Sequence, residues 1–166
     1  MCAILAHMDL SLYADILRDE LAVAAEAGGD EARALAERLG GEAGWKWLRI
    51  QGYRYAPDDR QPVCWTEVHV HGDFAGVARL LGRRSGPIYL LIEDLYGESV
   101  AEVEQSIRAR PVPEAIAATL GVKPGGIVID VQRIYRMSSG VVGVVAQNLY
   151  PAERFQVSMT LRRSKT

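Results

Sequence analysis

The chain has 166 residues, of which 49% are hydrophobic and 24% are charged, and its formal net charge at pH 7 is −2. This length predicts one domain with a core of its own, and the near-neutral charge argues against a protein that holds nucleic acid or anionic membrane by bulk attraction. Two cysteines, Cys2 and Cys64, exclude a disulfide framework, and the absence of a signal peptide or of about 18 consecutive apolar residues predicts a cytoplasmic protein without a membrane span.

The first quarter of the chain gives a helical pattern. Asp9–Ala27 is rich in alanine and leucine, and intrinsic propensity favours a helix there. Asp30 is a suitable N-cap for a second helix, because its carboxylate can accept the free amides of a first turn. That helix would bury Leu35 and Leu39 on one face.

Two β-rich segments follow, Trp45–Tyr55 and Cys64–Val70, and the polar loop Pro57–Pro62 separates them. Adjacent strands joined in this way predict an antiparallel hairpin. Side chains alternate between the two faces of a strand. One face of the first strand therefore carries Leu48, Ile50, Gly52 and Arg54.

Two short helices are predicted after the hairpin. Asp73 is a candidate N-cap for a helix over Phe74–Leu81, whose inward side chains would be Phe74, Val77 and Leu81. The second helix, Ile88–Tyr96, is closed by Gly97. Its apolar residues at helical spacing are Ile88, Leu91, Ile92 and Leu95.

The remaining chain alternates between strands and turns. Ser99–Arg110 predicts a strand, and Pro113 can open a helix over Glu114–Leu120. Lys123–Gly126 has proline and glycine in the order of a type II turn. Three further strands would form a meander: Ile127–Tyr135, Val141–Tyr150 and Phe155–Arg163. The sum predicts an α+β fold, in which one antiparallel β-sheet has its helices packed mainly on one face.

Motifs for catalysis or metal binding are weak. His69 and His71 would share one side of a strand end, and this is half of a zinc site if Cys64, Glu67 or Asp73 supplied further ligands. The alternative is two exposed polar residues where a strand leaves the sheet. The sequence has no nucleophile elbow and no phosphate-binding glycine loop. We therefore predict no catalytic residue, no metal and no cofactor.

A better candidate is a set of polar residues on the strands. If the sheet and its helices enclose a cleft, one face of each strand points into it. The first hairpin strand would contribute Arg54, and the second would contribute Thr66, between Cys64 and Val68. The strand Val141–Tyr150 would contribute every second residue. Such a cleft would be mostly apolar with a few hydrogen-bonding groups, as in small-molecule sites. The predicted ligand-binding residues are Arg54, Thr66, Gln105, Arg133, Asn148 and Tyr150.

Several arginines leave alternatives open. The Arg54 guanidinium suits a carboxylate or a phosphate, unless Arg54 merely ends its strand in water and Tyr150 is simple core. Arg133 lies mid-strand, so it either reaches the cleft or pairs with a structural carboxylate. The remaining charges on Ser99–Arg110 are interpreted as a surface mixture of Arg108 and Arg110 with Glu102 and Glu104.

An ordered set of segments resembles one known family. These segments are ALAERLGGEAGWKWLRIQGYRY, GPIYLLIEDLYG, LGVKPGG and YPAERFQVSMTLRR. Together they resemble the UTRA domain, the effector-binding domain of the HutC subfamily of GntR-type bacterial transcription regulators. The resemblance covers residues 9–163 and leaves residues 1–8 as a natural or vector-derived extension of a domain over 9–166. It places a first strand within Tyr13–Val23, where propensity favours a helix.

The resemblance also implies partners. It implies a small-molecule effector, a homodimer, and DNA contacts made by an N-terminal winged helix-turn-helix that this chain lacks. The exposed strand edges at Tyr13–Val23 or Ser99–Arg110 are the candidate dimer contacts. Two other functions stay open: a stand-alone enzyme similar to chorismate lyase, which shares the fold, and an interaction module with a vestigial pocket.

Compared with the family's site residues, the chain matches at some positions and departs at others. Members that bind phosphorylated or acidic effectors often carry Arg-x-Arg where this chain has Gly52-Tyr53-Arg54, and a glutamate where it has Val144. Tyr150 and the Arg154-Phe155 pair match, and the pair is expected to fix the final turn. Losing one cation and one carboxylate implies an effector smaller and less charged than a sugar phosphate, such as an organic or aromatic acid.

Overall fold

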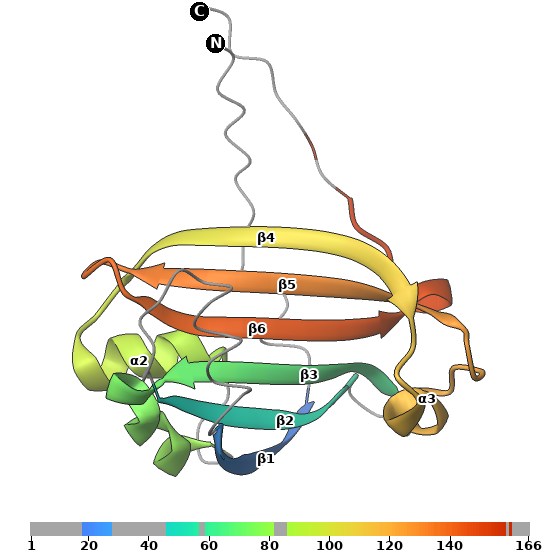
Figure 1. The fold of residues 1–166 in the computed structure, drawn as a ribbon, viewed down its shortest axis with the longest axis horizontal. Helices are drawn as coiled ribbons and strands as arrows, with labels where there is room; N and C mark the ends of the chain where they lie inside the picture. The colour runs from blue at the N-terminus through green and yellow to red at the C-terminus, as the bar shows by residue number, and fades with distance from the viewer. Residues whose placement is uncertain (1–17, 28–45, 57–58, 82–85, 159, 161–166) are drawn as a thin grey trace, which may run out of the picture.

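The computed structural model describes residues 18–27, 46–56, 59–81, 86–158 and 160, and for 18–27 it describes the backbone (Figure 1). The predicted helix with Asp30, Leu35 and Leu39 lies outside these residues. The elements in chain order are β1 (Arg18–Ala27), β2 (Trp47–Tyr55), β3 (Pro62–His71), the 3₁₀ helix η2 (Gly72–Leu80), α2 (Ile88–Tyr96), β4 (Val100–Pro111), α3 (Glu114–Leu120), β5 (Ile127–Met137), β6 (Val142–Pro151) and the 3₁₀ helix η3 (Ala152–Arg154).

The strands form one six-stranded sheet in the order β1-β2-β3-β6-β5-β4, with every neighbouring pair antiparallel (Figure 1). The predicted α+β fold is confirmed. The helix that propensity favoured within Asp9–Ala27 is wrong for residues 18–27, because pairing along β2 overrides local preference there. The first strand that the family resemblance implied within Tyr13–Val23 is correct for residues 18–23, and β1 continues to Ala27.

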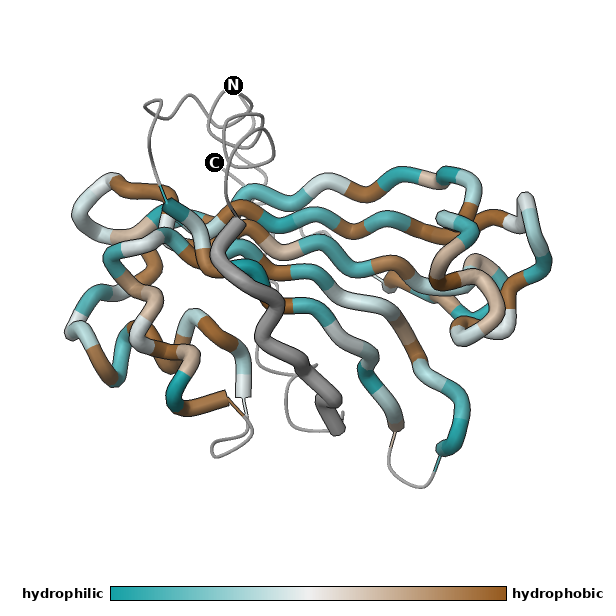
Figure 2. The backbone as a smooth tube through the Cα atoms, turned by 60° about the horizontal axis from the view of Figure 1, so that its bottom comes forward, coloured by the Kyte–Doolittle hydropathy of each residue, from teal (hydrophilic) through white to brown (hydrophobic). Residues whose placement is uncertain are grey.

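The register defines two faces of the sheet. The front face carries Leu48, Ile50, Gly52 and Arg54 of β2 together with their cross-strand partners, and the back face carries the residues in between. Figure 2 shows hydrophobic and hydrophilic positions alternating along the strands, as period-two patterning requires.

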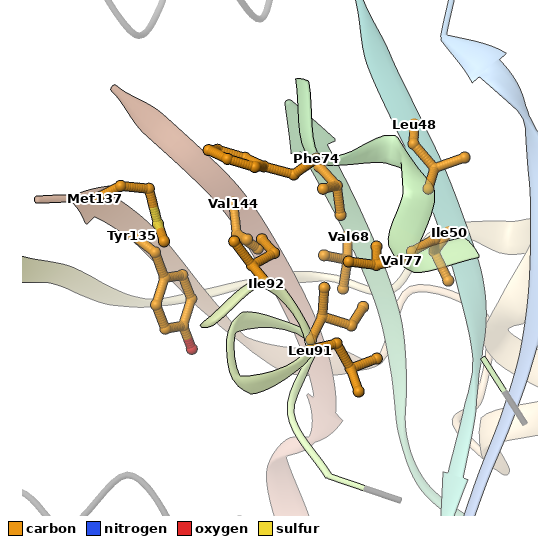
Figure 3. Close-up of a cluster of buried hydrophobic side chains, with 12 residues drawn as sticks. Leu48, Ile50, Val68, Phe74, Val77, Leu91, Ile92, Tyr135, Met137 and Val144 are labelled. Atoms are coloured by element: carbon orange, nitrogen blue, oxygen red, sulfur yellow. The ribbon is translucent and has the colours of Figure 1, made fainter. Parts of the chain in front are cut away.

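The helices η2 and α2 pack on one end of the front face (Figures 1 and 3). Burying each large apolar side chain there stabilises the fold by about 1.5–3 kcal/mol. The cluster comprises Leu48, Ile50, Val68, Val70, Phe74, Val77, Ile88, Leu91, Ile92, Tyr135, Met137 and Val144.

The third helix, α3, lies at the other end of the sheet and on its back face (Figure 1). Ile116, Ala117 and Leu120 pack there against Leu149 of β6 and Trp65 of β3. The bounds of α3 and α2 agree with the prediction, because proline opens each helix and glycine closes it in the left-handed conformation. The type II turn is confirmed as well: Gly125 has φ 75°, and the Gly126 amide donates to the Lys123 carbonyl at 2.8 Å.

Two details of the helices differ from the prediction. The cap of η2 is His71, not Asp73: strand β3 runs on to His71, whose Nδ1 accepts from the Asp73 amide at 3.3 Å. Leu95 has helical spacing with the buried Ile88, Leu91 and Ile92, but its own side chain is 49% exposed. The last turn of α2 lies against Gly76 of η2 rather than over the sheet, which leaves half of Leu95 in water.

The predicted closing strand Phe155–Arg163 is wrong where the structure describes it, because residues 155–158 form no strand. Strand β6 already has β3 on one side and β5 on the other. No edge of β6 is therefore open to a segment that follows it after a tight turn. The meander consists instead of β4, β5 and β6.

Candidate functional site

Beyond the part covered by η2 and α2, the front face carries polar side chains from five neighbouring strands. We call this region the polar end; it comprises Arg54, Thr66, Gln105, Arg133, Asn148 and Tyr150. The register places Gly52, Thr66, Asn148 and Val131 in one transverse row. A neighbouring row joins Val68, Ala146, Arg133 and Gln105. All six predicted residues thus share one face, as the alternation along each strand predicted.

Thr66 and Asn148 form the centre of the polar end. The Thr66 hydroxyl donates to the Asn148 side-chain oxygen at 2.8 Å, and both residues are buried. This bond fixes the orientation of the Asn148 amide, because its oxygen already accepts from Thr66. The amide nitrogen keeps two hydrogens for other acceptors, which makes Asn148 a fixed donor on this face.

Arg133 is the best-defined cation of the polar end. Its Nε donates to the Gln105 side-chain oxygen at 2.7 Å across the β4–β5 pair, and both side chains are half-buried. Of the two predicted alternatives, the structure supports a residue on the site face held by a neutral amide rather than by a structural carboxylate. Among the residues that the structure describes, no carboxylate forms an ion pair with Arg133.

Arg54 has a different setting. It is half-buried rather than at a strand end in water, and its register partner on β1 is Asp19. On the described strands β2 to β6, no residue at this end of the front face is Asp or Glu. This face therefore carries two guanidinium groups, those of Arg54 and Arg133.

Tyr150 lies close to both guanidinium groups. Burial raises the pKa of Tyr150 above its usual value, and Cys64 beside it acts in the same direction, whereas Arg54 and Arg133 lower the pKa. The phenol is therefore neutral at physiological pH and is able to donate a hydrogen bond. The ring of Phe155 lies 5.0 Å from the Tyr150 ring and supports it from the segment after β6.

The zinc hypothesis at His69 and His71 has no support in the structure. Both histidines are buried on the back face, so the alternative of two exposed residues is wrong as well. His71 packs edge-on against Trp47, with ring centroids 5.5 Å apart. Cys64 lies on the opposite face, and the described residues include no group of three or more His, Cys, Asp or Glu side chains suited to a metal.

Asp130 was not among the predicted residues, yet its buried carboxylate is the centre of a back-face network. Its Oδ2 accepts from Arg108 Nη2 at 3.0 Å, from Arg110 Nη1 at 3.3 Å and from Gln147 Nε2 at 2.9 Å. The prediction of a surface mixture with Glu102 and Glu104 is incomplete: Arg108 and Arg110 remain 59% and 36% exposed, but they also bind this buried carboxylate. The missing information was the β4–β5 register, which places Arg108 opposite Asp130.

A separate pocket of about 480 Å³ lies between the turn after α3 and η3, and its walls include Gln61, Lys123 and Arg154. It contains none of the six polar-end residues. Arg154 Nη2 donates to the Leu120 carbonyl at 2.8 Å, which ties the turn after β6 to the end of α3. This contact confirms the expected role of Arg154 in fixing the final turn.

The described residues contain no helix long and apolar enough to cross a membrane. The fold is similar to solved structures of transcription regulators at low sequence identity. A ligand-binding domain of a GntR-family regulator from Bordetella bronchiseptica has 22% identity and a TM-score of 0.67, with 90% of each chain covered. A GntR-family regulator from Bacillus cereus has 15% identity and a TM-score of 0.74, covering 88% of this chain and 99% of that one.

A further relative by fold is the effector domain of PhnF from Mycobacterium smegmatis, with 18% identity, a TM-score of 0.66 and 83% of each chain covered. No match was found among curated proteins. The sequence profile of the UTRA domain matches residues 30–156, which is more than half of the chain. The chain therefore belongs to the UTRA domain family.

Proposed function

We propose that this chain is the effector-binding and dimerisation domain of a bacterial GntR-type transcription regulator of the HutC subfamily, and that the polar end binds the effector. The observation that carries the proposal is the convergence of six polar side chains from five strands beside a packed apolar cluster. DNA would be contacted by a winged helix-turn-helix outside this chain, in a cytoplasmic homodimer.

The chemistry of the polar end favours an anionic effector. Arg133, the Asn148 amide and the Tyr150 hydroxyl all present donors, and a guanidinium binds carboxylates well. Val144 stands where family members often have a glutamate, and here it is buried in the apolar cluster. A cation beside apolar side chains suits a small organic or aromatic acid better than a sugar phosphate.

Regulation would follow from linkage between effector binding and dimer arrangement. An effector shifts the population of DNA-competent dimers only by its difference in affinity for the two arrangements. A tenfold difference corresponds to about 1.4 kcal/mol, which is enough to change occupancy of an operator. The effector therefore needs contacts that exist in one arrangement and not in the other.

A thermal-shift screen tests the proposal. Aromatic and aliphatic carboxylic acids should raise the melting temperature of the wild-type chain, and Arg133→Gln should abolish the rise. Arg136→Gln is the matched control, because Arg136 is exposed and faces away from the polar end on the same strand. Stabilisation by sugar phosphates alone would contradict the assignment of an acid, and no stabilisation by any metabolite would favour an interaction module.

The second candidate is an enzyme similar to chorismate lyase that acts on a small aromatic or organic acid. It rests on the shared fold and on two guanidiniums near Tyr150 that would also bind a dicarboxylate. The buried Val144 argues against it, because family members often have a glutamate at this position and valine has no acid-base group. Turnover of chorismate by the purified chain would favour the enzyme over the regulator.

A further inference from the structure

Within the part of the chain that the structure describes, strand β4 is one edge of the sheet and pairs with β5 on its other side. An edge strand presents backbone amides and carbonyls that can pair with another strand. The alternate side chains of β4 on the back face form an ordered series of charges. In sequence order they are Glu102, Glu104, Ser106, Arg108 and Arg110.

This series is self-complementary. We propose that β4 pairs antiparallel with β4 of a second copy about a twofold axis at Ser106, which rests on the proposed dimeric function. In that register Glu104 lies opposite Arg108 of the partner subunit, and Glu102 lies opposite Arg110 of the partner subunit. Opposite charges at facing positions stabilise antiparallel strands.

The neighbouring registers are less favourable. An axis at Gln105 places Glu104 opposite Ser106 of the partner subunit, and an axis at Ile107 places Ser106 opposite Arg108 of the partner subunit. Each of these registers leaves acidic or basic residues without an opposite charge. Pairing centred on Ser106 matches both acids with both bases, so the charges specify the register as well as the orientation.

The arginines are already held in place for such contacts. Arg108 Nη2 and Arg110 Nη1 bind the buried Asp130, while the two side chains stay 59% and 36% exposed. A guanidinium has five N–H donors, so each arginine retains donors for a second carboxylate. Glu104 makes no ion pair with any residue that the structure describes, and its register partner on β5 is Ile134.

The same register connects the effector site to the seam between the two copies. On the front face, Gln105 lies opposite Ile107 of the partner subunit. Gln105 also accepts the hydrogen bond from Arg133. An effector anion that draws Arg133 away from Gln105 therefore changes a side chain in the seam. Ile107, which is 44% exposed in the single chain, would become covered.

Sedimentation equilibrium of Glu104→Lys tests the charge pattern. The substitution places like charges opposite each other at two symmetric positions, and we expect the dimer dissociation constant to rise about tenfold or more. Glu153→Lys is the matched control, because it makes the same charge change at an exposed residue away from the edge. Equal dissociation constants for the two variants would overturn the proposal.

Disulfide trapping tests the axis itself, in a Cys2→Ser background in which the buried Cys64 is retained. Facing residues of antiparallel strands have Cα atoms about 4.5–5.5 Å apart, within the range of a disulfide. Ser106→Cys should therefore form a covalent dimer under mild oxidation. Ala101→Cys, equally exposed on the same strand, should not, because its two copies would be about ten residues, or roughly 33 Å, apart.

Equal cross-linking of the Ser106→Cys and Ala101→Cys variants would overturn the register. Dimer formation through β4 and binding of an effector are measured independently, so the failure of one proposal can be distinguished from the failure of the other. A chain that stays monomeric but is stabilised by carboxylic acids would reject the seam and keep the effector site. A chain that cross-links through the Ser106→Cys variant but responds to no acid would reject the effector assignment and keep the seam.

Discussion

Replacing Asp130 with alanine should destabilise the fold more than replacing any exposed acidic residue. The carboxylate side chain has no exposed surface, and it accepts hydrogen bonds from two arginines and from Gln147. Removing the carboxylate leaves the half-buried Gln147 amide without this acceptor. Arg108 and Arg110 of β4 also lose the acceptor that holds their side chains in place.

The magnitude follows from what each donor loses. Removing one partner from a fully buried ion pair costs about 3–5 kcal/mol. Arg108 and Arg110 are 59% and 36% exposed, so water replaces much of what they lose, and the estimate is reduced. We expect a loss of about 2–3 kcal/mol in the free energy of unfolding, which corresponds to about 4–12 °C in melting temperature for a chain of this size.

Urea unfolding followed by circular dichroism measures this change, with Glu114→Gln as the control at an exposed helix position. Asp130→Asn separates the effect of charge from the effect of shape. The amide keeps the size of the side chain, but its NH₂ group is a donor that faces the donors of Arg108, Arg110 and Gln147. We expect Asp130→Asn to be destabilising as well. A loss below about 0.5 kcal/mol for Asp130→Ala would refute the reasoning, since that is the size of an ordinary surface substitution.

Three further predictions concern single groups. Thr66→Val should cost about 1–3 kcal/mol in urea unfolding, because the buried Asn148 oxygen loses its donor, whereas Thr66→Ser should cost less. Gly125→Ala should cost about 1–2 kcal/mol, since φ is 75° and no atom crowds the new methyl group; unchanged stability would argue against the type II turn. Because burial raises the pKa of Tyr150, the unfolded chain ionises first, so stability should fall as pH rises through about 10. Tyr150→Phe should reduce that fall, and an identical pH profile would count against a buried phenol.

Elements with local boundary signals could be predicted from the sequence. Pro113 and Gly121 surround α3, and Pro87 and Gly97 surround α2, so chain chemistry alone sets where these helices begin and end. The six residues of the polar end could also be predicted to share a face, because alternation along each strand determines the face once the strands are known.

Features that depend on distant pairing could not be predicted. Residues 18–27 have helical propensity, and only their pairing with β2 makes them a strand. The segment after Pro151 has β-forming residues, but both edges of β6 are occupied. Asp130 looks like any strand residue until the β4–β5 register brings two arginines to it. In each case the deciding information lies in a partner strand far along the chain.

Strands β3 and β6 each serve two purposes along their length. Val68 and Ala146 pack with the apolar cluster, and Thr66 and Asn148, two positions further along, carry the polar groups. If the polar end binds the effector as proposed, point substitutions at these outer positions would change the preferred ligand and leave the apolar cluster in place. Related sensors with such a site would acquire new ligands one residue at a time, without a change in the packed part of the sheet.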